Sequence, residues 1–200
     1  MSSESRRLNS VCVYCASSSA VAPEFLAAAE SLGEILARED LRLVYGGGGV
    51  GLMGACARAA HAAGGRVLGV IPHFLTSHER PLKTVETVVV NSMHERKMMM
   101  FEEADAFAIL PGGIGTLEEV IELLSWRRLG LHAKPIVFLN AMGFWTPLFE
   151  LLEHIVEQDL VPAEFRDCWR TVSEVEDLLP ALRSMPTLAF TTPPGVEEMT

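Results

Sequence analysis

The sequence has few positive charges. It holds 16 lysines and arginines against 26 aspartates and glutamates, which gives a formal net charge of −10 at pH 7. Nucleic acids and anionic membrane surfaces are bound through basic patches, so we expect neither partner. No apolar run is long enough to span a bilayer, and the first ten residues lack the apolar stretch of a signal peptide. We therefore expect a cytoplasmic protein, whose ligand could still be a small anion.

Cysteines are also few: Cys12, Cys15, Cys56 and Cys168. Cys12 and Cys15 form a C-x-x-C, but they lie in an apolar run typical of a strand, where an offset of three residues places them on opposite faces. No second C-x-x-C completes a zinc site. We therefore expect buried reduced thiols and no bound metal.

Short apolar runs alternate with helical patterns along the chain. The runs predict strands at 11–14, 41–45, 66–71, 85–90, 106–110, 135–139 and about 169–172. The helical periodicity predicts helices at 23–38, 52–63, 93–104, 116–129, 144–158 and 175–183. This alternation indicates an α/β fold, a Rossmann-like open parallel sheet with helices on both faces. We expect one domain at 10–185, between flexible segments 1–9 and 186–200, with its ligand at the carboxyl ends of the strands.

A first glycine-rich turn follows the second predicted strand. It contains a G-x-G-x-x-G at Gly49, Gly51 and Gly54. A dinucleotide site would also need an acidic residue after the third strand, where the chain has Pro72 and His73. The turn therefore favours a simpler nucleotide or phosphate contact over an NAD site. Close packing of a helix on a strand is the alternative.

A second glycine-rich turn, Pro111-Gly112-Gly113-Ile114-Gly115-Thr116, follows the fifth predicted strand. Its backbone N–H groups and the Thr116 hydroxyl could bind a phosphate at a helix N-terminus. Glu119 lies one turn further, and a carboxylate facing the sugar would stabilise positive charge at the anomeric carbon. In the alternative, Thr116 and Glu119 form only a capping box.

A third motif, Ser92-Met93-His94-Glu95-Arg96-Lys97, opens the helix after the fourth strand. Ser92 and Glu95 have capping-box spacing. Arg96 and Lys97 lie near the positive end of the helix, where cations are disfavoured unless an anion is close. They indicate either an anion-binding cleft or a solvated helix start.

Together with Leu129-Gly130-Leu131-His132-Ala133-Lys134-Pro135, these motifs resemble the LONELY GUY (LOG) family of cytokinin riboside 5′-monophosphate phosphoribohydrolases. The resemblance runs from about residue 11 to about residue 182. It implies a Rossmann-like homodimer without a cofactor. It also implies hydrolysis of the N-glycosidic bond of a nucleoside 5′-monophosphate, which releases an N6-substituted adenine and ribose 5-phosphate.

The resemblance also implies roles for individual residues. Arg96 and Glu119 would be the catalytic pair. The other residues would bind substrate: Lys97, Glu79 as the nearest match to an acidic residue before the fourth strand, Gly112, Gly113, Ile114, Gly115, Thr116, Gly46, Gly47, Gly51, Met53 and Ser17. Ile114 stands where relatives commonly have tyrosine, and Arg127 and Arg128 where they often have small or polar residues. These departures bear on the choice of base.

Two other functions fit the same motifs. One is an AMP nucleosidase or general purine nucleotide phosphoribohydrolase, and the other is a non-catalytic nucleotide or cofactor carrier. Related proteins have also been labelled lysine decarboxylases. A pyridoxal phosphate enzyme needs a Schiff-base lysine, and this chain has only Lys83, Lys97 and Lys134. Lys97 lies beside Arg96, and Lys134 lies at the entry to a strand, so we do not expect that chemistry.

Overall fold

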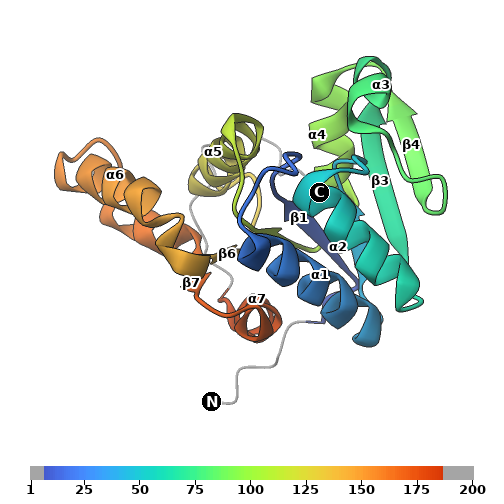
Figure 1. Cartoon of the computed structure of the whole chain (residues 1–200). Helices are drawn as coiled ribbons and strands as arrows, with labels where there is room; N and C mark the ends of the chain where they lie inside the picture. Colours follow the sequence, from blue (N-terminus) through green and yellow to red (C-terminus); the bar gives the residue numbers. More distant parts are fainter. Residues whose placement is uncertain (1–6, 187–200) are drawn as a thin grey trace.

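A computed structural model describes residues 7–186, whose strands form one seven-stranded parallel sheet (Figure 1). Its spatial order is β4-β3-β2-β1-β5-β6-β7. The strands are β1 (Ser10–Tyr14), β2 (Arg42–Tyr45), β3 (Val67–Pro72), β4 (Glu86–Val90), β5 (Ala106–Ile109), β6 (Ile136–Leu139) and β7 (Arg170–Val172). The order reverses between β1 and β5, the point where sheets of this kind bind ligands. The predicted α/β class and parallel sheet are confirmed.

Helices cover both faces of the sheet (Figure 1). On one face lie α1 (Pro23–Arg38), α2 (Gly51–Ala62) and α7 (Leu178–Ser184), packed on one core cluster. On the other lie α4 (Met93–Glu102), α5 (Ile114–Arg128) and α6 (Thr146–Glu157), packed on a second. The short helix α3 (Thr76–Glu79) lies in the segment between β3 and β4. The two-sided cover explains why the strands are nearly continuous apolar runs.

The central strand β1 shows how the sequence produces these layers. All five of its residues are buried. Val11 and Val13 pack into the cluster under α1 and α2, whereas Cys12 and Tyr14 pack into the cluster under α4 and α5. Cys15 joins the first cluster, so the predicted placement of Cys12 and Cys15 on opposite faces is confirmed. The four cysteines are free and buried.

The predicted elements differ from the observed ones mainly at their ends. The range of α1 is as predicted, but α5 begins at Ile114 instead of residue 116, and α4 ends at Glu102 instead of residue 104. The last predicted helix, 175–183, divides into a 3-10 turn at Val175–Asp177 and α7. Four further short elements were not predicted: α3 and the 3-10 turns His73–Leu75, Ala141–Gly143 and Ala163–Cys168.

The predicted terminal segments lie mainly outside the described residues. Leu8 is buried in the core, and the backbone N–H of Asn9 donates to Asp105 Oδ2 (2.7 Å). Among residues 7–186, no helix has both the length and the apolar character needed to cross a membrane. Within the same range, no group of three His, Cys, Asp or Glu side chains is arranged to hold a metal ion.

Candidate functional site

A cavity of about 290 Å³ lies at the carboxyl ends of β1, β2 and β5. Parallel pairing brings these ends together, since Val13 of β1 stands opposite Tyr45 of β2 and Ala108 of β5. Ten residues of the predicted site line the cavity: Ser17, Gly46, Met53, Glu79, Arg96, Gly113, Ile114, Gly115, Thr116 and Glu119. Four others, Gly47, Gly51, Lys97 and Gly112, are not part of the lining.

The N-terminus of α5 opens into this cavity. Gly113 is the N-cap residue, no side chain caps the helix, and Leu117 N–H donates to Gly113 O (3.0 Å). The preceding N–H groups, from Ile114 to Thr116, therefore have no acceptor within the helix. A Cβ added at Gly113 or Gly115 would meet no atom within 4 Å, so there is open space beside these two residues. The arrangement suits an anion.

The capping-box alternative for Thr116 and Glu119 is wrong. Because α5 begins at Ile114, Thr116 lies inside the first turn and is not the N-cap. Its side chain packs on Gly112, where an added Cβ would lie 2.2 Å from Thr116 Oγ1. Glu119 therefore has no capping role. The lack of a side chain at Gly112 leaves space for the side chain of Thr116.

The N-terminus of α2, in the first glycine-rich turn, is closed. Gly51 N–H donates to Ser19 Oγ (3.3 Å), and the N–H groups of Leu52 and Met53 both point to Ala16 O (3.0 and 3.3 Å). Gly51 has a φ of +59° and lies so close to Ser17 that an added Cβ would be 2.5 Å from its carbonyl carbon. These amides are occupied, so the hydrogen bonds favour the close-packing alternative for this part of the turn.

Arg96 projects from α4 into the cavity and is buried. Its Nη2 donates to Gly46 O (3.2 Å), and its Nη1 lies 3.6 Å from Glu119 Oε1. A Cβ at position 46 would lie 2.0 Å from Arg96 Nη2. Gly46 is therefore required for the guanidinium to reach the carboxylate.

Glu119 has an unusual environment for a carboxylate. It is only 8% exposed, and burial raises its pKa from 4.5 to about 7, although Arg96 acts in the opposite direction. Near neutral pH the group is thus divided between acid and carboxylate. Perturbed titration in a cleft is typical of a functional site.

Glu79 reaches the cavity from α3. Its Oε2 atom is buried and has no hydrogen-bond partner among the described residues. Burial raises the pKa of Glu79, and Arg96 opposes the increase. Gly49 N–H donates to Glu79 O (2.7 Å), which holds this segment against the first glycine-rich turn. An unpartnered buried carboxylate oxygen beside a cavity can accept a hydrogen bond from a ligand.

Comparison with known proteins agrees with these motifs. The family described as "Possible lysine decarboxylase" matches residues 53–182. A probable cytokinin riboside 5′-monophosphate phosphoribohydrolase of Oryza sativa subsp. japonica, LOG4, is 42% identical over 88% of this chain and 76% of its own length. LOG7 of Arabidopsis thaliana is 44% identical over 78% of this chain and 72% of its own length. The cytokinin riboside 5′-monophosphate phosphoribohydrolase of Rhodococcoides fascians is 41% identical over 88% of this chain and 89% of its own length. The chain belongs to the LOG family.

Solved structures of the same fold include proteins with other names. A molybdenum cofactor binding protein of Rippkaea orientalis aligns over 90% of this chain and 98% of its own, with a TM-score of 0.67 and 24% identity. A molybdenum cofactor carrier protein of Chlamydomonas reinhardtii aligns over the same shares, with a TM-score of 0.68 and 21% identity. At this identity the likeness shows the fold that the LOG family shares with them.

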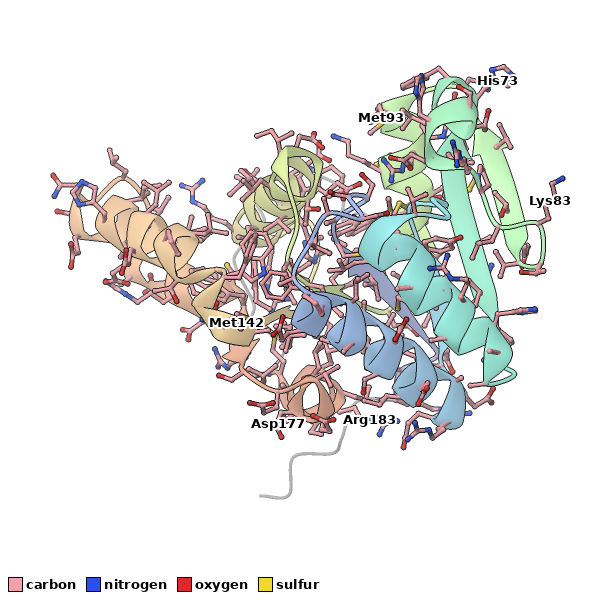
Figure 2. The ribbon with its side chains drawn as sticks, in the orientation of Figure 1. His73, Lys83, Met93, Met142, Asp177 and Arg183 are labelled. Carbon is pink, nitrogen blue, oxygen red and sulfur yellow. The ribbon has the colours of Figure 1, made fainter. Side chains whose placement is uncertain are left out.

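None of the three lysines lines the cavity of this LOG-family chain. Lys83 is exposed before β4 and projects from the surface (Figure 2). Lys134 Nζ donates to Phe101 O (2.6 Å) and lies over the Phe101 ring. Lys97 Nζ pairs with Glu118 (2.5 Å) and Glu122 (2.9 Å) on α5. A Schiff base in this cavity would therefore have no lysine in place.

Sequence reasoning missed some of the lining. Tyr14, Cys15 and Met100 line the cavity, but their positions in an apolar run and in a helix are typical of core residues. The position of Tyr14 at the carboxyl end of the first strand is the signal that marks it, since ligands of open α/β sheets lie beyond such ends.

Proposed function

We propose that this chain hydrolyses the N-glycosidic bond of a cytokinin riboside 5′-monophosphate, releasing free N6-substituted adenine and ribose 5-phosphate. One helix, α5, supplies both halves of the site. Its uncapped N-terminus at Ile114 suits the 5′-phosphate, and Glu119 lies five residues further, about 7.5 Å along the helix axis. That separation is comparable to the span from the phosphate to C1′ of a nucleotide. The names of the LOG relatives support the same reaction.

The proposed mechanism follows from these positions. The α5 amides fix the phosphate and so orient the ribose. As the C1′–N9 bond breaks, its electron pair leaves with the base, and C1′ develops oxocarbenium character. The Glu119 carboxylate stabilises this charge. Water then attacks C1′, its oxygen stays on the ribose, and its proton balances the charge of the departing base. Arg96 holds Glu119, and the free oxygen of Glu79 accepts a hydrogen bond from the nucleotide.

Base release from a panel of nucleotides tests the proposal. The purified protein would be incubated with isopentenyladenosine monophosphate, with AMP and with the corresponding nucleosides, and free bases measured by chromatography. We expect release from the monophosphates alone and faster release from the isopentenyl substrate. Release only from AMP would identify the AMP nucleosidase alternative. Retention of nucleotide with no free base after long incubation would identify a carrier, and release from nucleosides would contradict the phosphate requirement.

We also propose that the chain works as a homodimer in the cytoplasm. Three exposed apolar residues mark one side of α5, namely Ile114 (84% exposed), Ile121 (45%) and Leu129 (40%). Their spacings of seven and eight residues place them along one face of the helix. Exposed apolar stripes of this kind are typical of subunit contacts. Ile114 also lines the cavity, so a partner on this face would lie beside its mouth.

The subunit contact can be tested at Ile121. A buried carboxylate in an apolar interface is strongly unfavourable, so Ile121→Glu is expected to halve the mass measured by sedimentation equilibrium. Leu160→Glu is the matched control, because Leu160 is 69% exposed and lies beyond the end of α6. A dimer mass for both variants would contradict this face as the contact, and a monomer mass for the unmodified protein would contradict the homodimer itself.

A further inference from the structure

Neighbouring cations on α4 have different surroundings. Arg96 points into the cavity, whereas Lys97 points sideways to α5 and does not line the cavity. Lys97 Nζ lies 2.5 Å from Glu118 Oε1 and 2.9 Å from Glu122 Oε2, and its side chain is only 13% exposed. Burial lowers the pKa of Lys97, but the hydrogen bonds with Glu118 and Glu122 outweigh that effect and raise it. Both carboxylates therefore hold a fully charged ammonium group.

The spacing of Glu118 and Glu122 allows their ion pairs with Lys97 to restrict the rotation of α5. Glu118 and Glu122 are four residues apart, so they lie on the same stripe of α5. Glu119 projects about 100° further round the helix. A cation that binds both members of the stripe opposes rotation of α5 against α4. The same contact therefore limits where Glu119 can point relative to Arg96.

We propose that Lys97 is a positioning residue, which holds α5 in the rotation that keeps Glu119 beside Arg96, and that it does not bind the nucleotide. This inference rests on the proposed function for its effect on catalysis. Adjacent ion pairs link α4 to α5. Arg96 pairs with Glu119 on the cavity side, and Lys97 pairs with Glu118 and Glu122 outside the cavity. A fully exposed ion pair would have little effect. Here the Lys97 side chain is only 13% exposed, although its partners Glu118 (52%) and Glu122 (30%) are more open, and the ammonium group lies one residue from Arg96.

Lys97→Met removes the charge and keeps the length of the side chain. Small misplacements of catalytic groups cost up to about 100-fold in rate, so we expect kcat to fall roughly 10- to 100-fold with KM changed by less than about threefold. Lys97→Arg should retain most of the activity. Lys83→Met is the control, because Lys83 is exposed on the loop before β4 (Figure 2). Circular dichroism and thermal unfolding would establish that each variant is folded.

A charge exchange separates bridging from ligand binding. Lys97→Glu alone should be more damaging than Lys97→Met, because it places a third carboxylate beside Glu118 and Glu122. Adding Glu122→Lys restores an ion pair across the helices and should recover a large part of kcat. A nucleotide-binding lysine would not be replaced by a lysine on α5. Failure of the exchange to recover activity, or a Lys97→Met variant with raised KM and normal kcat, would overturn the proposal.

A titration independent of activity completes the test. The charged groups that influence Glu119 are Arg96 and Lys97 from α4, Glu79 from α3 and Glu118 on its own helix. Loss of the Lys97 charge raises the pKa of Glu119 directly, and loss of its position beside Arg96 raises it further, so carboxyl NMR should show a higher pKa for Glu119 in Lys97→Met than in the unmodified protein. The Lys97→Arg variant should show little change. An unchanged pKa in Lys97→Met would refute the positioning role, even if the protein released no base.

Discussion

Replacing Glu119 with glutamine is expected to reduce base release by roughly 10³-fold or more. The amide has nearly the same shape as the acid, so it can occupy the same buried position beside Arg96. It carries no negative charge, however, and so cannot stabilise the oxocarbenium-like carbon. The amides that we propose to bind the phosphate lie at the start of α5, about one helical turn before Glu119, and are unchanged. Nucleotide affinity, measured by calorimetry, should therefore stay within a few-fold of normal.

The stability of the same variant checks the reason for the loss. The pKa of Glu119 is raised in the folded protein from 4.5 to about 7, so the folded state holds its proton more tightly than the unfolded state. Its contribution to stability is complete below pH 4.5 and is lost as the pH rises through 7. The stability lost between low pH and pH 7 amounts to roughly 3 kcal/mol.

Glu119→Gln does not ionise, so it should unfold at higher urea concentration than the unmodified protein at pH 7 and lose this advantage near pH 4. Glu150→Gln, on the exposed surface of α6, is the control and should change neither property. Near-normal base release from Glu119→Gln would remove the carboxylate from the mechanism.

The fold was predictable because the relevant signals are local. Apolar runs between helical patterns predict the parallel sheet, and the range of α1 follows from its periodicity and from Pro23, which suits the start of a helix. The Ser92 cap was also readable, since Glu95 N–H donates to Ser92 Oγ (3.1 Å). At Thr116 the same spacing was misleading. A helix can begin at a glycine N-cap without a side-chain cap when its free amides suit a ligand, and sequence spacing alone does not separate the two cases.

Contacts between elements that are distant in the sequence were less predictable. Glu79 ends a four-residue helix, which is too short to show an amphipathic period. The next residue, Arg80, has a positive φ of 47°, which few residue types favour. Lys97 meets residues that are 21 and 25 positions further along the chain. Its motif suggested an anion site, and only the packing of α4 on α5 shows that the anions are two glutamates. Long-range pairing of this kind is set by tertiary packing.

Removal of Arg96 should lower activity through the charge state of Glu119. In the unmodified protein, kcat/KM should rise with pH through about 7 as the Glu119 carboxylate forms. Arg96 lowers the pKa of both Glu119 and Glu79, so Arg96→Met leaves the buried Glu119 and the half-buried Glu79 without this cation. Both pKa values should then increase. At pH 7 Glu119 becomes largely protonated, and we expect a loss of roughly 10²-fold or more.

The pH profile distinguishes this electrostatic role from direct contact with substrate. If Arg96 acts on Glu119, the rising limb of the Arg96→Met profile moves to higher pH, and part of the activity returns near pH 9. Gly46→Ala should cause a smaller shift in the same direction, because the added Cβ displaces the guanidinium from its place 3.6 Å from Glu119. Lys83→Met, on the exposed loop before β4 and outside the cavity, is the control and should leave the profile unchanged. An equal loss of activity at every pH would mean that Arg96 acts on the nucleotide and not through the carboxylate.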